Sequence, residues 1–312
     1  MNIELIAPLS QAWKRMKTAL FQPFDITKWF MVGFTAFLAG LLDYKGGGRG
    51  ENSSEYGINE GLYEFFTFPE TVRQWLVDHP LVSSLIVVGI IFAIAVIIVL
   101  LWLSSRGKFM FLYNVVHDKA EVSFPWREYA REANSLFLWR LGFTVISLLV
   151  FGLTFYYAFN HFREAYFDNE PFVSQIPSLI GIGLLFIVVT ILISLISLYL
   201  DSFVVPVMFK HRISASQAWN KFLIIFWPKL GYFILYALFI LILLILVGIL
   251  VVVFGFMTCC IGFLLLIIPY IGSVILLPVT YTFRAYSIEF LAQFGEEFDI
   301  LETASGEENI GE

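Results

Sequence analysis

Charged and hydroxyl side chains interrupt two long apolar segments at a regular spacing. Counted from the charged residue, the hydroxyls lie 4, 7 and 11 positions away in one segment and 4 and 7 positions away in the other. Such steps place each set on one face of a helix. The seven residues are Asp201, Ser197, Ser194 and Thr190 in one segment, and Arg140, Thr144 and Ser147 in the other.

A charge inside a membrane costs about 2.5–3.5 kcal/mol on insertion scales, so an intramembrane charge usually has a partner or a function. If the two segments are antiparallel neighbours, Arg140 lies level with Asp201. We therefore predict a polar seam closed at its cytoplasmic end by an Arg140–Asp201 ion pair. Two interpretations stay open: close packing through small hydroxyl residues, or a pathway or lipid head-group cradle in which Arg140 binds the anion.

Other residue types that carry chemistry are not arranged for it. None of the four histidines has the spacing of a helical metal site, and no pair of carboxylates lies in an apolar segment. The glycine run 46–50 lacks the Gly-Lys-Ser/Thr ending of a phosphate loop, and Cys259-Cys260 favours apolar packing over redox work. We predict a non-enzymatic protein with no cofactor, no metal and no nucleic-acid partner.

The amino-acid composition indicates the kind of structure that positions these residues. The 312 residues are 59% hydrophobic and 14% charged, against about 45–50% and about 25% in soluble domains. This composition excludes a water-soluble fold. The sequence predicts an all-α, polytopic membrane bundle with six transmembrane helices plus amphipathic interfacial helices. The predicted spans are 27–42, 81–103, 136–159, 179–200, 230–254 and 261–283.

The basic residues indicate which side each connection occupies. Fourteen fall on one side of the six predicted spans and four on the other. By the positive-inside rule both termini are cytoplasmic, and the predicted localisation is the bacterial cytoplasmic (inner) membrane. Residues 1–290 form a single transmembrane domain in this interpretation. Residues 291–312, rich in acids, are expected to be a disordered cytoplasmic tail.

A short repeat precedes two of the spans. Ser10-Gln11-Ala12-Trp13 recurs as Ser216-Gln217-Ala218-Trp219, each in a segment with amphipathic helical spacing. Basic amphipathic helices bind anionic inner leaflets, so membrane lipids are the expected partner. Anchoring of the adjacent spans is the alternative role. The expected inner-leaflet contacts are Trp13, Lys14, Arg15, Lys17, Trp219 and Lys221.

The sixth predicted span contains Pro269 and Pro278. Interior prolines remove a backbone hydrogen bond and kink a helix. A kinked structural helix and a transport gate are both consistent with this pattern, since interrupted helices often bind substrate in transporters.

Four motifs resemble those of bacterial multi-span proteins related to the membrane domain of glycerophosphoryl diester phosphodiesterase. They are the opening 6–13, the run 20–30, the Pro206-Val207-Met208 exit and the repeat 216–219. The resemblance implies an inner-membrane helical bundle with amphipathic cytoplasmic helices. It implies no catalytic residue in this chain, because no soluble phosphodiesterase domain is attached.

Two functions remain. The first is a non-enzymatic integral membrane protein that organises lipid or a membrane-protein partner at the inner leaflet. The alternative is a small-molecule or lipid transporter that uses the polar seam and the proline-kinked sixth span.

Overall fold

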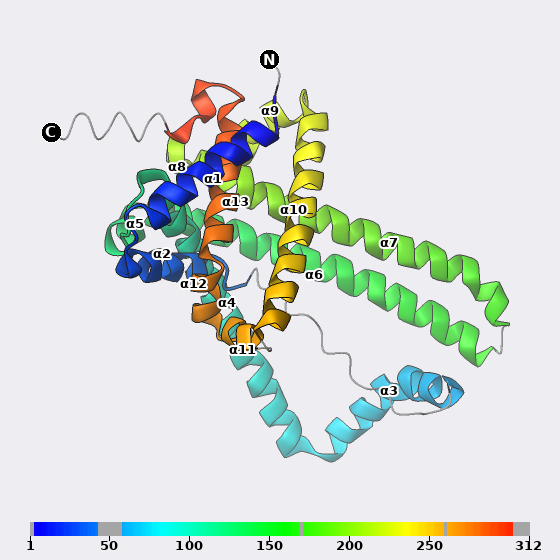
Figure 1. Cartoon of the computed structure of the whole chain (residues 1–312). Coiled ribbons are helices and arrows are strands. Elements are labelled where there is room, and N and C mark those ends of the chain that lie inside the picture. Colours follow the sequence, from blue (N-terminus) through cyan, green and yellow to red (C-terminus); the bar gives the residue numbers. More distant parts are fainter. Residues whose placement is uncertain (1–2, 43–57, 169–170, 259–260, 302–312) are drawn as a thin grey trace. The chain divides into compact units, whose positions relative to one another are not determined.

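A computed structural model describes residues 3–42, 58–168, 171–258 and 261–301, and every regular element in these ranges is a helix. The all-α prediction is therefore confirmed for the described chain (Figure 1). The glycine run 46–50 and Cys259-Cys260 lie outside the described residues.

The helices differ widely in length along the chain. The first seven are α1 (Ile6–Phe21), α2 (Ile26–Ala39), α3 (Ile58–Asp78), α4 (Pro80–His117), α5 (Ser123–Glu128), α6 (Ala130–Phe167) and α7 (Phe172–Tyr199). The next four are the π-helix η1 (Leu200–Val204), α8 (Val205–His211), α9 (Ala215–Phe226) and α10 (Leu230–Met257). The last four are α11 (Ile261–Ile267), α12 (Pro269–Ile275), α13 (Leu277–Ala292) and the 3-10 helix η2 (Glu296–Phe298).

The chain forms two compact units. Unit 1 comprises Met1–Tyr44, Leu101–Arg140 and Ser194–Glu312, and unit 2 comprises Lys45–Leu100 and Leu141–Ile193. The long helices α4, α6 and α7 each contribute residues to both. Their unit 2 portions are apolar and exposed, whereas α4 becomes buried from Leu101 onward.

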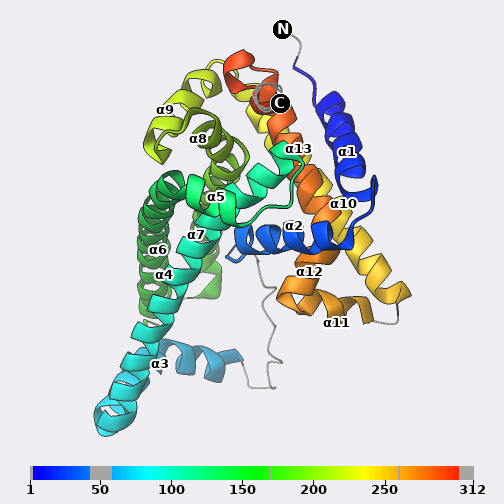
Figure 2. The same ribbon diagram turned by 90° about the vertical axis from the view of Figure 1, so that its left-hand side faces the viewer.

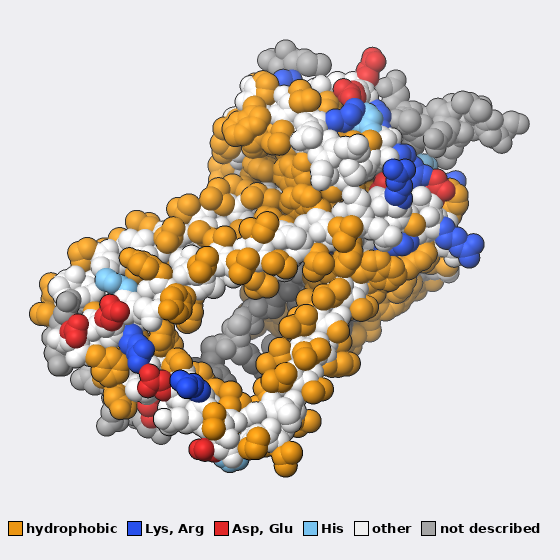
Figure 3. Space-filling model, turned by 180° about the vertical axis from the view of Figure 1, so that it is seen from behind, with side chains coloured by type: hydrophobic (Ala, Val, Ile, Leu, Met, Phe, Trp, Pro, Cys, Tyr) orange, Lys and Arg blue, Asp and Glu red, His pale blue; other side chains and the backbone are white. Residues whose placement is uncertain are grey.

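Within the described ranges, four helical stretches are long and apolar enough to cross a membrane. They are Pro80–His117, Ala130–Phe167, Val173–His211 and Leu230–Met257. Hydrophobic side chains cover the long helices along most of their length (Figure 3). Water-soluble monomers expose apolar patches of only a few hundred Å², so this surface is that of a membrane protein.

The first and sixth predicted spans have a different form. The first is the 14-residue α2, only about 21 Å long at 1.5 Å per residue. The sixth is divided among α11, α12 and the start of α13. Prolines cause the breaks: Ile268, just before Pro269, is extended at ψ 110°, and Pro278 stands in the first turn of α13.

The two short apolar helices α2 and α12 pack against each other. The Tyr270 hydroxyl donates to the Phe30 carbonyl at 2.9 Å. A Cβ on Gly33 would lie 2.6 Å from the Val274 side chain, so this contact requires glycine. Gly107 of α4 is equally constrained, because its Cβ would lie 2.5 Å from the backbone of α2.

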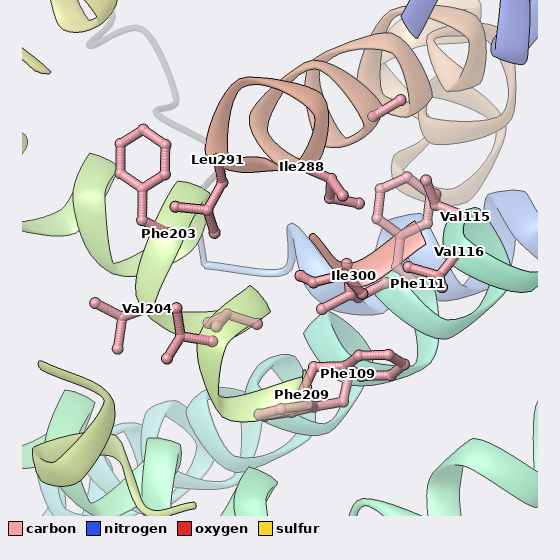
Figure 4. Packing of buried hydrophobic residues seen from close by; sticks show 14 of the residues in the cluster. Phe109, Phe111, Val115, Val116, Phe203, Val204, Phe209, Ile288, Leu291 and Ile300 are labelled. Atoms are coloured by element: carbon pink, nitrogen blue, oxygen red, sulfur yellow. The ribbon is translucent and has the colours of Figure 1, made fainter. Parts of the chain in front are cut away.

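Unit 1 has the dense core of the molecule. Its aromatic and aliphatic side chains come from α1, α2, α4, α6, η1, α8, α9, α10 and α13, with Phe109 and Phe203 fully buried. Figure 4 shows Phe109, Phe203, Leu291 and Ile300 of this cluster, drawn from segments far apart in the sequence.

The first part of the predicted disordered tail, residues 291–301, is packed in unit 1. Phe298 and Ile300, placed within the predicted disordered tail, are buried in unit 1. Lys210 donates to the carbonyls of Glu296 at 2.5 Å and Asp299 at 2.6 Å. Buried apolar side chains and these hydrogen bonds together attach the segment up to Leu301 to unit 1. Residues 302–312 lie outside the described chain.

Candidate functional site: a buried ion pair and an apolar groove

The helix that carries Asp201 widens to a π-helix at this residue. In a π-helix the N–H of residue i bonds the carbonyl of residue i−5, and Pro206, five residues after Asp201, has no N–H. The guanidinium of Arg284 on α13 supplies the missing donor, since its Nη1 lies 2.5 Å from the Asp201 carbonyl. The bond ties α13 to η1.

Lys108 of α4 forms an ion pair with Asp201. Its Nζ lies 2.7 Å from Asp201 Oδ2, and the residue is 1% exposed. The other carboxylate oxygen, Oδ1, is buried and has no hydrogen-bond partner in the described chain. Removal of the Asp201 carboxylate would leave the buried Lys108 charge uncompensated, which costs about 3–5 kcal/mol, whereas the Asp201 side chain itself keeps 30% exposure. The pair therefore fixes α4 to η1.

Arg140 has other contacts. Its Nη1 donates to the hydroxyls of Ser104 at 3.0 Å and Ser105 at 3.4 Å. Ser104 in turn donates to the Ala39 carbonyl at 2.9 Å. Arg140 thus links α6 to α4 and α2, while Asp201 has Lys108 as its ion-pair partner instead of the expected arginine.

The seam residues are divided between the two units. Thr144, Ser147 and Thr190 belong to unit 2, and Ser194 and Ser197 belong to unit 1 with the two charged residues. Within unit 2, Thr144 and Thr190 are exposed, and the Thr190 hydroxyl donates to the Phe186 carbonyl of its own helix at 2.8 Å. The proton of this hydroxyl is therefore used within its own helix.

The N-terminal helix α1 has two different faces. Pro8, Ala12 and Met16 are buried where α1 packs against α13 (Figure 2). Trp13 is 50% exposed, and the Lys17 ammonium lies 5.6 Å from the centroid of its ring. This separation is typical of a cation–π contact.

The three basic residues of α1 differ in exposure. Lys14 and Lys17 are exposed, whereas Arg15 is half-buried. Its buried Nη1 has no hydrogen-bond partner among the described residues. The exposed cations of α1 are thus the two lysines.

The other Ser-Gln-Ala-Trp helix, α9, begins with a capping box formed by Ser214 and Gln217. Trp219 is half-buried and stacks on Trp139, with 5.5 Å between ring centroids. Lys221 pairs with Glu297 at 2.5 Å. The hydrogen bond and charge of Lys221 lower the pKa of the Glu297 carboxyl below its usual value. Both expected lipid contacts of α9 have protein partners.

A groove of about 380 Å³ lies between α1, α10 and α13. We call it the α1–α10–α13 groove. Its walls are apolar apart from two hydroxyl residues, one of which, Thr282, donates to the Pro278 carbonyl of its own helix at 2.6 Å. The lining residues are Ile6, Leu9, Ser10 and Trp13 from α1, Leu243, Leu246 and Val247 from α10, and Val279, Thr282 and Phe283 from α13.

The roles of Lys108 and Arg284 and the groove itself are not apparent from the sequence pattern. Lys108 is one of the inner basic residues in that pattern, although its apolar neighbours from Phe109 to Leu112 signal burial. Arg284 is a charge that flanks the sixth predicted span. No group of three metal-ligating side chains occurs in the part of the chain that the structure describes.

The comparisons with known proteins give a family but no function. No curated protein and no solved structure matches the chain. A model of a family of unknown function, DUF7544, matches residues 4–277, which is most of the chain. The protein is therefore a member of DUF7544.

Proposed function

We propose that this protein is a non-enzymatic integral membrane protein that organises anionic lipid at the inner leaflet through α1. The observation that carries the proposal is the outer face of α1, where the exposed Trp13 lies beside the exposed cations Lys14 and Lys17. An amphipathic helix with an aromatic anchor and lysines binds anionic membrane surfaces. The protein contacts of Trp219 and Lys221 favour this role for α1 rather than for α9.

The accompanying topology is six membrane-embedded segments with both termini in the cytoplasm of a bacterial cell. Its support is the fourteen-to-four division of basic residues. The short helices α2 and α12, which pack as a pair, are embedded segments that do not cross as single straight helices. A reporter enzyme fused after Glu312 tests the orientation: activity of a cytoplasmic reporter agrees with it, and activity of a periplasmic reporter contradicts it.

The lipids that copurify with the protein test the function. Extraction into native nanodiscs followed by lipid mass spectrometry should show anionic phospholipid enriched over the bulk membrane. The double variant Lys14→Glu/Lys17→Glu should lose the enrichment. Lys119→Glu, an exposed cation change elsewhere in unit 1, is the control. Equal lipid composition in the protein, the double variant and the bulk membrane would refute the proposal.

A transporter is the second candidate, favoured by the buried Asp201 Oδ1 and by the broken helical segment from Ile261 to Ala292. Such a protein needs a water-filled path to the middle of the bilayer. Cysteines at Thr190 and Ser194 would then react with a membrane-impermeant maleimide. Absence of reaction at both positions would eliminate this candidate.

A further inference from the structure

The α1–α10–α13 groove lies beside a cluster of stacked rings between α10 and α13. A stripe of α10 spaced by three and four residues faces a matching stripe of α13. The two stripes are Phe233, Tyr236, Ile240, Leu243 and Val247 on α10, and Phe290, Tyr286, Phe283 and Val279 on α13.

Large rings fill the space at one end of these stripes. Tyr236 stacks on Tyr286 with 5.4 Å between centroids and 6° between planes, and Phe233 stacks on Phe294 at 4.9 Å. At the other end Leu243 and Val247 of α10 and Val279 of α13 line the groove, which α1 borders. The groove thus adjoins the ring cluster of unit 1 and has mostly aliphatic walls.

Three properties identify the chemistry of an occupant. The volume of the groove lies in the range typical of ligand sites, about 300–1,000 Å³. The walls contain no charged side chain, and the Thr282 hydroxyl already has an acceptor. One wall, α10, is a membrane-length helix with lipid-exposed neighbours such as Leu241. A hydrocarbon chain that enters sideways from the bilayer satisfies all three.

The edge of the groove has a positive charge. Trp13 is a wall residue, and Lys17 holds its ammonium over the Trp13 ring at 5.6 Å. A negatively charged head group therefore finds a cation next to the place where its chain enters. We propose that the α1–α10–α13 groove binds one acyl chain of an anionic phospholipid and that Lys17 contacts the head group. The inference rests on the proposed function and names its site.

Photolabelling of the full-length protein tests the site without any substitution. The protein is reconstituted in vesicles that contain phosphatidylglycerol with a diazirine in its acyl chain, and a parallel sample contains phosphatidylcholine with the same chain. Phosphatidylglycerol should label α1 and residues 279–283 more strongly than it labels the exposed apolar face of α7. Phosphatidylcholine should label these peptides about threefold less, which corresponds to about 0.65 kcal/mol, because its head group has no net charge to attract Lys17.

Two variants of α10 give a matched pair. Leu243→Trp fills the groove and should lower phosphatidylglycerol labelling of α1 about tenfold, as expected for a loss near 1.4 kcal/mol. Leu241→Trp places the same side chain on the exposed face of α10, outside the groove, and should leave the labelling unchanged. Lys17→Ala should abolish only the preference for phosphatidylglycerol over phosphatidylcholine.

Each outcome has a defined meaning. Equal labelling of α1 and α7 in the unsubstituted protein, or equal effects of the two tryptophan variants, would overturn the inference. Crosslinking of two copies through the groove in lipid-free detergent would assign it to self-association and would also overturn the inference. If anionic lipid is enriched in nanodiscs but the groove is not labelled, only this inference fails; if neither occurs, the proposed function fails as well.

Discussion

The helices α1 and α9 share the residues Ser-Gln-Ala-Trp but have different environments. In both, the alanine is fully buried: Ala12 and Ala218 are each 0% exposed. The next residue differs. Trp13 is 50% exposed and has Lys17 of its own helix over its ring, whereas Trp219 stacks on Trp139 of α6. The same four residues therefore fix how a helix packs but not what its tryptophan contacts.

The elements across from each helix decide the difference. Helix α1 packs on α13, and the neighbouring α10 leaves a groove beside Trp13. Helix α9 packs on η1 and α8, with α6 and η2 close enough to engage Trp219 and Lys221. An amphipathic pattern alone cannot separate a lipid-facing helix from one covered by protein.

The largest loss of stability should come from breaking the Lys108–Asp201 ion pair at η1, which supports both helices. Lys108→Met removes the partner of Asp201, whose side chain is 30% exposed, so we expect the free energy of unfolding to fall by about 3 kcal/mol, at the low end of the range for buried pairs. Because η1 supports α9 and is tied to α13 under α1, both helices should become protease-sensitive together. Limited proteolysis with mass spectrometry measures this. Loosening of one helix alone would show that they do not share a support.

Truncation of the two tryptophans should have unequal effects. Trp219→Ala removes a stacked, half-buried ring and should cost about 3 kcal/mol, at the low end of values for buried tryptophan. Trp13→Ala should cost less than about 1 kcal/mol in detergent, because half of that side chain is exposed. Thermal unfolding monitored by circular dichroism compares them. Equal losses would contradict the assignment of different environments.

Much of this comparison was accessible from the sequence. The repeat and the amphipathic segments are identified from spacing in the sequence. Ser214 and Gln217 also stand three residues apart, the spacing of a capping box, and the structure contains this cap. Four of the predicted spans overlap the four membrane-length helices. These features depend on residues near each other in the chain, whose spacing is visible in the sequence.

The remainder depends on residues far apart in the chain. Asp201 has Lys108 as its partner because α4 continues as a buried helix beyond the apolar stretch that ends near Leu103. The bond from Arg284 to the Asp201 carbonyl can be predicted only if it is known which helix faces Pro206. The groove is bounded by α1, α10 and α13, which are far apart in the sequence. No spacing rule within one segment contains this information.

The two buried alanines should behave alike. A leucine at either position inserts three heavy atoms into a filled contact, and overpacking of this kind costs about 1–3 kcal/mol. We expect Ala12→Leu and Ala218→Leu to lower the unfolding free energy by similar amounts, about 2 kcal/mol each. Chemical unfolding in mixed micelles gives both values. A loss at only one alanine would show that the repeat does not mark equivalent packing positions.

The capping box should be a smaller difference between the helices. Ser214→Ala removes the α9 cap and should cost about 1 kcal/mol. In α1 the N-cap is Leu5, whose side chain packs against the core and makes no cap hydrogen bond, so α1 has no comparable cap to lose. Hydrogen exchange of the first turn of each helix reports the change. Unchanged exchange in α9 after Ser214→Ala would show that the cap contributes nothing.

The smallest effect concerns pH. Lys221 holds the pKa of Glu297 below its usual value, so the pair stabilises the fold above the pKa of the unfolded state, about 4.3. That contribution is lost as the pH falls through the folded-state pKa, and for an exposed pair it is below about 1 kcal/mol. Glu297→Gln should remove this part of the pH dependence. Thermal unfolding between pH 3 and pH 5, in steps of about 1 unit, measures how stability depends on pH. The same pH dependence in the variant and the unsubstituted protein would contradict the pairing.

The most direct test of the central claim, that α1 faces lipid and α9 does not, uses equivalent residues of the repeat. Ser10 and Ser216 are both exposed, and each is replaced by a nitroxide-labelled cysteine after Cys259 and Cys260 are changed to serine. Collision rates with lipid-soluble oxygen and with a water-soluble nickel chelate are then compared in vesicles. The account predicts that oxygen dominates at position 10 and the nickel chelate at position 216. The same ratio at both positions would contradict it.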